Sequence, residues 1–99
     1  MLSDDELLRY ARQIMLPAFD VAAQEKLKAA RVLVVGMGGI GCPLSLYLAA
    51  AGVGELLLAD FDVIEASNLQ RQLLYAEADL GRLKAEVAAA RLAVVNPFV

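Results

Sequence analysis

The chain has 99 residues, which is enough for one small domain and too few for two. It is 60% hydrophobic, which excludes intrinsic disorder, and its net charge of −3 argues against bulk electrostatic binding to nucleic acid or anionic membranes. The chain has one cysteine, which excludes an internal disulfide and a multi-cysteine zinc site. It has no histidine, which excludes histidine zinc sites and Ser-His or Cys-His catalysis within the chain.

Residues 1–30 predict a helical N-terminal arm with two helices. The segment Ser3–Glu6 is a capping box, and the helix that it opens is expected to reach about Met15, before Pro17 ends it. Asp20 is placed to cap a second, shorter helix. The apolar face expected on the first helix comprises Leu7, Leu8, Ala11, Ile14 and Met15.

Two apolar runs predict parallel strands. Residues 32–35 and 56–59 show no alternation with polar residues, which is typical of strands buried on both faces. Residues 40–51, rich in leucine and alanine, predict a helix between them. Gly52 follows this helix in the position that favours a left-handed residue.

The stretch from residue 32 to residue 54 has no charged side chain and is long enough to span a bilayer. Four glycines and Pro43 crowd its middle, however, and would break one continuous helix. A buried strand followed by a buried helix has the same hydropathy. We therefore predict no membrane segment.

The last third of the chain predicts a long loop and then a helix. Residues 61–79 are expected to be mostly loop, with a short helix after Ser67. Residues 80–95 predict a helix that Asn96-Pro97 stops, and Phe98–Val99 predict the start of a third strand. The apolar positions expected to recur on this helix are Leu83, Val87, Ala90 and Val94.

This order predicts an α/β fold: a Rossmann-like parallel sheet with a βαβ nucleotide-binding unit, preceded by two N-terminal helices. We expect residues 31–99 to form the βαβα unit and residues 1–30 the arm. Two strands make a small sheet, so we expect residues 1–99 to be the N-terminal portion of a larger domain.

A glycine-rich turn carries the main functional signal. Gly36, Gly38 and Gly41 have the spacing G-x-G-x-x-G, directly after a predicted strand and before a helix. Such glycines permit a tight turn, close approach of a phosphate and close helix packing. Asp60 ends the second strand, 24 residues after Gly36, where a carboxylate can accept hydrogen bonds from ribose hydroxyls or cap a turn. Asp62 is a weaker candidate for the same role.

The positive charges allow two interpretations. Arg71 could clamp a polyphosphate through forked hydrogen bonds. Lys84 lies in the first turns of a helix, where an anionic ligand would offset its unfavourable interaction with the helix dipole; alone, it is more simply a solvated lysine. Arg12 has a simple structural interpretation, as an exposed charge on the amphipathic face of the first helix. Cys42 is expected to be buried rather than catalytic, and one unpaired thiol suits the cytoplasm.

Together these residues resemble the E1-like ThiF/MoeB/HesA adenylating enzymes over essentially the whole chain. The resemblance is carried, in chain order, by Arg9–Gln13, Val34–Gly41, Ala51–Gly54, Asp60–Asp62, Ser67–Gln72, Lys84 and Asn96-Pro97. The order and spacing of these segments are much more specific than the glycine motif alone.

The resemblance implies an enzyme that uses Mg-ATP to adenylylate the C-terminal glycine of a ubiquitin-like sulfur-carrier protein of molybdopterin or thiamine biosynthesis. It implies that Arg12 reaches the triphosphate of the other subunit in a homodimer. The family's magnesium-binding aspartate lies beyond this segment, so no metal ligand is expected here. The implied nucleotide-binding residues are Gly36, Gly38, Gly39, Gly41, Asp60, Asp62, Ser67, Asn68 and Gln72; the implied catalytic residues are Arg71, Lys84 and Arg12.

Two alternatives remain open. The glycine loop and Asp60 also fit an NAD- or FAD-binding module of an oxidoreductase. Arg71 and Lys84 favour ATP, because a dinucleotide has no terminal phosphate for them to hold. The third hypothesis is a catalytically incomplete fragment that only binds nucleotide or associates with itself through its exposed sheet edge.

Overall fold

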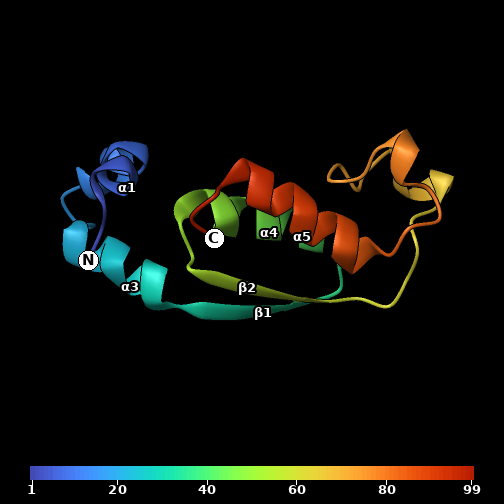
Figure 1. Ribbon diagram of the computed structural model, residues 1–99, viewed down its shortest axis with the longest axis horizontal. Coiled ribbons are helices and arrows are strands. Elements are labelled where there is room, and N and C mark those ends of the chain that lie inside the picture. The colour runs from blue at the N-terminus through green and yellow to red at the C-terminus, as the bar shows by residue number, and fades with distance from the viewer.

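The computed structural model describes residues 1–99, in which two parallel strands pair side by side (Figure 1). Strand β1 (Arg31–Val35) pairs in register with β2 (Glu55–Ala59). Helix α4 (Gly41–Ala51) connects the strands, and helix α5 (Lys84–Val95) follows them. The predicted α/β class with a parallel βαβ unit is confirmed.

The core lies between one face of the sheet and helices α4 and α5. Val34, Met37, Ala49 and Val87 belong to its central cluster of buried side chains. The predicted burial of both strand faces is wrong: Leu33 is 61% exposed. The reason is that both helices pack on the same face, as Figure 1 shows, and no other element covers the opposite one.

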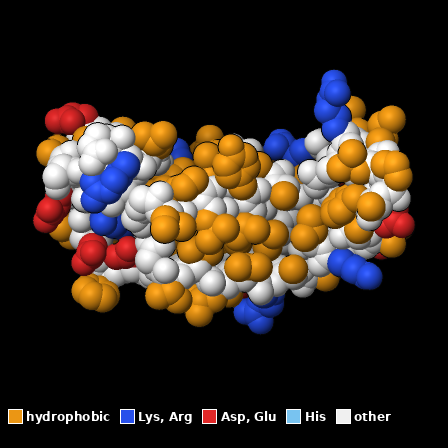
Figure 2. All heavy atoms as spheres, turned by 180° about the vertical axis from the view of Figure 1, so that it is seen from behind, with side chains coloured by type: hydrophobic (Ala, Val, Ile, Leu, Met, Phe, Trp, Pro, Cys, Tyr) orange, Lys and Arg blue, Asp and Glu red, His pale blue; other side chains and the backbone are white.

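Apolar side chains also remain exposed on and beside α4. Ile40 and Tyr47 are 82% and 75% exposed, and Leu73 in the later loop is 80% exposed. Figure 2 shows hydrophobic side chains gathered along the middle of one face of the molecule, with the charged side chains mainly toward its ends. Helix α4 contains no charged residue, so nothing interrupts this surface along the helix.

Three helical segments lie together at one end of the molecule: α1 (Asp4–Arg9), α2 (Ala11–Ile14) and α3 (Val21–Ala29) (Figure 1). The capping box at Ser3 and the cap at Asp20 are both formed, as predicted. No helix in the chain is long and apolar enough to cross a membrane.

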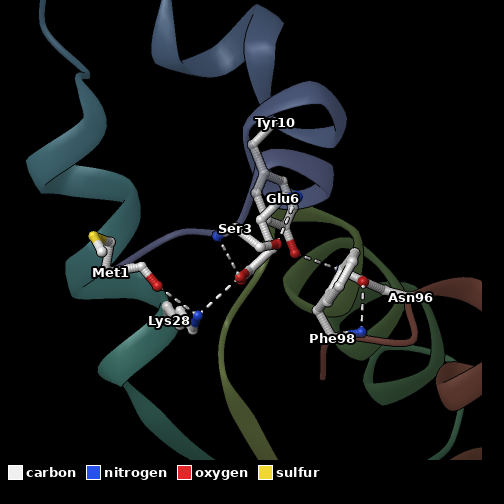
Figure 3. A network of polar contacts seen from close by, with 7 residues as sticks. All are labelled: Met1, Ser3, Glu6, Tyr10, Lys28, Asn96 and Phe98. Carbon is white, nitrogen blue, oxygen red and sulfur yellow. Dashed lines mark hydrogen bonds and ion pairs between the residues drawn. The ribbon is translucent and has the colours of Figure 1, made fainter.

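The prediction of one continuous first helix is wrong, because Tyr10 separates α1 from α2 with a φ of −98° and a ψ of 10°. The predicted apolar face is wrong as well, since Leu8 and Met15 are 79% and 80% exposed. Tyr10 is buried instead, and its hydroxyl accepts a hydrogen bond from Asn96 at the far end of the sequence (Figure 3). That contact determines which side of the helix faces inward.

The loop after β2 contains two single 3₁₀ turns, η1 (Ala66–Asn68) and η2 (Glu77–Asp79), so the first begins two residues earlier than predicted. The last helix begins at Lys84 rather than at residue 80, because Gly81 has a φ of +81°. Of its four predicted apolar positions only Val87 is buried, because Leu83 and Val94 are 41% and 82% exposed and Ala90 is exposed as well. The predicted third strand at residues 98–99 is not formed, since β1 and β2 alone make up the sheet.

Candidate functional site

The predicted glycine turn joins β1 to α4 at the end of the sheet that faces away from α1 (Figure 1). Gly36 adopts a φ of +90°, which strongly favours glycine. A Cβ on Gly41 would lie 1.9 Å from the Gly36 carbonyl oxygen, so a side chain there would collide with the turn. Both glycines are therefore required by the backbone itself.

The N–H groups of Gly38, Gly39 and Ile40 donate no hydrogen bond within the chain. No side chain caps the N-terminus of α4 either. Free N–H groups before a helix, together with the positive end of the helix dipole, form an environment that binds anions. We define Gly36–Gly41 as the glycine loop.

The carboxylate of Asp60 is joined to the base of the glycine loop. Its Oδ2 accepts a hydrogen bond from the Met37 N–H at 2.8 Å, and its Oδ1 accepts one from the Asp62 N–H at 2.8 Å. The turn-capping interpretation of Asp60 is therefore confirmed. Each carboxylate oxygen can accept a further hydrogen bond, so contact with a ribose remains a prediction.

The segment that follows β2 returns to the glycine loop. An ideal Cβ built on Gly39 would lie 3.6 Å from Arg71 Cδ, and one built on Gly38 would lie 3.5 Å from Gln72 Nε2. Arg71 is exposed, and its Nη1 donates to the Ser67 carbonyl at 3.0 Å. Gln72 is only 3% exposed, yet its Oε1 has no hydrogen-bond partner. The predicted loop and the predicted polar segment are thus neighbours in space.

Lys84, at the glycine-loop end of the molecule, is a charged residue with little exposure to solvent. It is the first residue of α5, and its main-chain N–H donates to the Asp62 carbonyl at 3.0 Å. Only 6% of the residue is exposed, and its ammonium group lies in none of the ion pairs of the chain. At the first turn of a helix the dipole disfavours a cation, and no carboxylate of the chain lies within ion-pair distance to offset this.

A cavity of about 220 Å³ adjoins Lys84. It is lined by Asp62, Val63, Glu65, Asn68 and Lys84. Asn68 is 9% exposed, and its Oδ1 accepts a hydrogen bond from the Glu65 N–H at 3.0 Å, which shapes the loop. The cavity therefore presents an ammonium and an amide group beside the acidic residues Asp62 and Glu65.

The same donors do not make a magnesium site. The chain contains no group of three or more His, Cys, Asp or Glu side chains that could hold a metal ion. Binding of Mg²⁺ by residues outside this segment therefore stays a prediction.

Arg12 is not brought to this site. It is an exposed residue of α2, which lies at the opposite end of the molecule from the glycine loop (Figure 1). A role at a phosphate of this same chain is excluded by that placement. A role toward a second copy remains a prediction.

Two side chains near the glycine loop, Cys42 and Tyr75, are buried, and the sequence predicted only the first. Cys42 is 2% exposed, as predicted, and desolvation raises the pKa of its thiol, which argues against a thiolate nucleophile. Tyr75 was missed by sequence analysis: its hydroxyl donates to the Met37 carbonyl at 2.6 Å. No local pattern marks this tyrosine, because its contact joins residues 38 positions apart.

Comparison with known proteins identifies related sequences. The ThiF family matches residues 10–99. The chain is 57% identical over 98 residues to a molybdopterin-synthase adenylyltransferase of Salmonella typhimurium, covering 99% of this chain and 39% of that protein. It is 59% identical over 98 residues to an adenylyltransferase and sulfurtransferase of Mus musculus, covering 99% of this chain and 21% of that protein. The chain thus spans two fifths or less of these relatives.

Solved structures share the fold. The tRNA N6-threonylcarbamoyladenosine dehydratase of E. coli matches with a TM-score of 0.90 and 31% identity, covering 99% of this chain and 40% of that chain. E. coli MccB, solved with ATP, matches with a TM-score of 0.76 and 46% identity, covering 77% of this chain and 23% of that chain. The Rossmann-like arrangement is therefore common to this chain and to these larger proteins.

Proposed function

This chain belongs to the ThiF family, and on that basis we propose that it supplies the ATP-binding half of an adenylyltransferase. The proposed reaction transfers AMP from ATP to the C-terminal carboxylate of a ubiquitin-like sulfur-carrier protein. The names of the adenylyltransferase relatives support the reaction class. The solved complex of E. coli MccB with ATP supports the choice of nucleotide.

The observation that carries the proposal is Lys84. The residue is 6% exposed and forms no ion pair, so its ammonium group is free to bind a negative charge from outside the chain. The phosphates of a nucleotide held at the glycine loop would supply it. Arg71, which lies against Gly39, would provide a second positive charge for the same group.

The proposed chemistry follows from charge. A carboxylate oxygen forms a bond to the α-phosphorus, and the bond to the leaving pyrophosphate breaks. Negative charge develops on the transferred group and on the pyrophosphate, and fixed cations and N–H groups stabilise both. In this scheme Lys84 and Arg71 bind phosphate oxygens, the glycine loop orients the nucleotide, and Asp60 accepts a hydrogen bond from the ribose.

The remaining predicted contacts belong to the same proposal. Ser67, Asn68 and Gln72 would complete the wall of the nucleotide site, with Asp62 beside them. Arg12 would act on the triphosphate held by a second copy in a homodimer, since it lies far from the phosphate site of its own chain.

The magnesium ion, the carrier and the location are also proposed. Mg²⁺ would be bound by the triphosphate and by an acidic side chain outside these 99 residues. A sulfur carrier of molybdopterin biosynthesis is favoured over one of thiamine biosynthesis by the name of the Salmonella typhimurium relative. The single thiol suits a cytoplasmic protein.

Calorimetric titration of the chain with Mg-ATP, and with NAD for comparison, tests the nucleotide. We expect micromolar binding of ATP and none of NAD. Preference for NAD would replace the proposal with an oxidoreductase module, and binding of neither would reduce the chain to a fragment without an independent nucleotide site.

Arg71→Ala tests the phosphate contact separately. It should weaken ATP more than AMP by about 1–3 kcal/mol, as expected for a charge-assisted hydrogen bond to a terminal phosphate. Asp60→Ala should weaken both nucleotides alike, because both carry the ribose. Equal losses of ATP and AMP on Arg71→Ala would remove this residue from the terminal phosphates.

A further inference from the structure

One peptide group at the base of the glycine loop is held from two directions. Met37 is fully buried, and its N–H donates to Asp60 Oδ2 at 2.8 Å. Its carbonyl oxygen accepts a hydrogen bond from Tyr75 Oη at 2.6 Å and a weaker one from Cys42 Sγ at 3.5 Å. Both polar groups of residue 37 are therefore bound by side chains of other segments.

Beyond Met37, main-chain hydrogen bonds fix the middle of the loop only through its carbonyls: those of Gly38 and Ile40 accept from the N–H groups of Cys42 and Leu44, both at 3.0 Å. The next three residues, Gly38–Ile40, donate no main-chain hydrogen bond within the chain. Two glycines in this stretch also give the backbone wide conformational freedom. The orientation of the free N–H groups therefore depends on the residues at the two ends of the loop, and Met37 is the one that side chains hold.

Tyr75 is well suited to this task. Its residue is 6% exposed, so its hydroxyl is shielded from competing water. Burial raises the pKa of the Tyr75 hydroxyl above its ordinary value, which keeps the proton available for donation. Tyr75 also follows Arg71 and Gln72 closely in the sequence, and these two side chains lie against Gly39 and Gly38. One short segment thus contacts the loop at three successive residues.

We propose that Tyr75 is a positioning residue, which holds the Met37 carbonyl so that the N–H groups of the glycine loop are ready to bind phosphate. This inference rests on the proposed function, because it assumes that phosphate is the ligand of the loop. It concerns orientation and not catalysis: Tyr75 acts on a bound nucleotide only through Met37.

A second buried tyrosine provides a matched control. Tyr10 is 3% exposed, and its hydroxyl accepts a hydrogen bond from Asn96 Nδ2 at 2.8 Å. It lies in the N-terminal helices, at the other end of the molecule (Figures 1 and 3). Tyr75→Phe and Tyr10→Phe each delete one buried hydroxyl and keep the ring, so a general effect on packing would appear in both.

The first measurement is amide hydrogen exchange without nucleotide. The hydrogen-bonded N–H groups of Met37 and Cys42 flank the loop. We expect Tyr75→Phe to speed exchange at both about threefold to tenfold, the effect of losing one hydrogen bond, and to leave the Gly52 amide unchanged. Tyr10→Phe should not change exchange at Met37 or Cys42. Unchanged exchange in Tyr75→Phe would overturn the proposal.

The second measurement is the affinity for ATP and for adenosine. Tyr75→Phe should bind ATP about threefold to tenfold more weakly and adenosine with unchanged affinity, because only ATP has phosphates for the loop. Tyr10→Phe should keep the ATP-to-adenosine ratio of the wild type. Equal losses of ATP and adenosine in Tyr75→Phe would overturn the positioning role. If the wild type fails to bind ATP, the proposed function falls, while hydrogen exchange still decides whether Tyr75 holds the loop.

Discussion

The two ends of this elongated molecule differ in how completely their buried polar side chains are paired within the chain. At the end formed by α1, α2 and α3, such groups find partners within the chain (Figure 3). Asn96 Nδ2 donates to Tyr10 Oη at 2.8 Å and to the Ala49 carbonyl at 2.7 Å. Buried Glu6 is paired with Lys28 at 2.8 Å.

At the glycine-loop end, Tyr75 and Asn68 have hydrogen-bond partners within the chain, but two other side chains do not. Lys84 is 6% exposed and forms no ion pair, and Gln72 Oε1 is buried without a hydrogen-bond donor. Buried polar groups in folded proteins are nearly always satisfied, so the exceptions need an explanation. The comparison supports our proposal that the first end stabilises the fold, whereas the second binds a nucleotide.

The largest effect should follow from adding a side chain at Gly41 in the glycine loop. Gly41→Ala places a Cβ 1.9 Å from the Gly36 carbonyl oxygen, so the turn and the helix behind it cannot both persist. We expect a loss of about 3 kcal/mol or more in the free energy of unfolding, measured by urea denaturation. Gly39→Ala is the control, because its Cβ would meet Arg71 only at 3.6 Å. A Gly41→Ala variant as stable as Gly39→Ala would contradict this geometry.

The two lysines provide the sharpest contrast between the ends. Lys84→Met should weaken ATP binding by about 1.5–3 kcal/mol and leave stability unchanged or raised, because it removes a cation that forms no ion pair from the first turn of a helix. Lys28→Met should leave ATP binding unchanged and lower stability by about 1 kcal/mol, a modest value because the Lys28 side chain is 41% exposed. Calorimetry and thermal unfolding of both variants provide the test. The reverse pattern would invert the roles assigned to the two ends.

Asn96→Ala should lower stability through the end formed by α1, α2 and α3 and leave the glycine loop unchanged. It leaves Tyr10 Oη and the Ala49 carbonyl without this donor, and it should lower the free energy of unfolding by about 1–3 kcal/mol. The ATP-to-adenosine affinity ratio should not change. A variant of full stability whose ratio has shifted would show that the two ends are coupled.

The smallest effect is expected from acid at Glu6. Hydrogen bonds from Lys28 and from the Ser3 main chain lower the pKa of this carboxyl below its ordinary value of 4.5. The charged form is thus favoured in the folded state, so its contribution to stability is full above the ordinary pKa and is lost as pH falls through the lowered one. Unfolding measured between about pH 6 and pH 2 should show a steeper acid loss for wild type than for Glu6→Gln. Parallel curves would contradict the assignment.

What the sequence predicts well is local. The spacing of Gly36, Gly38 and Gly41 predicts a turn that the backbone confirms, because the demand for glycine arises within a few residues. The capping box at Ser3 is equally local. The neighbourhood of Arg71 and the glycine loop follows from the family resemblance rather than from pattern.

What the sequence does not predict depends on distant contacts. The break at Tyr10 and its burial depend on Asn96, 86 residues away. The late start of α5 follows Gly81, whose left-handed conformation ends the preceding turn and whose N–H donates to the distant Ile64 carbonyl at 2.8 Å. Tyr75 likewise gains its contact only when the loop folds back on Met37.

The most direct test of the difference between the two ends is an NMR titration of the ¹⁵N-labelled chain with ATP. The account predicts saturable shifts at the amides of Gly38–Gly41, Arg71 and Lys84, and unchanged signals at Tyr10, Gln24 and Asn96. Shifts centred on the N-terminal helices, or no shifts at all at saturating ATP, would contradict the claim that the unpaired groups around the glycine loop bind a nucleotide.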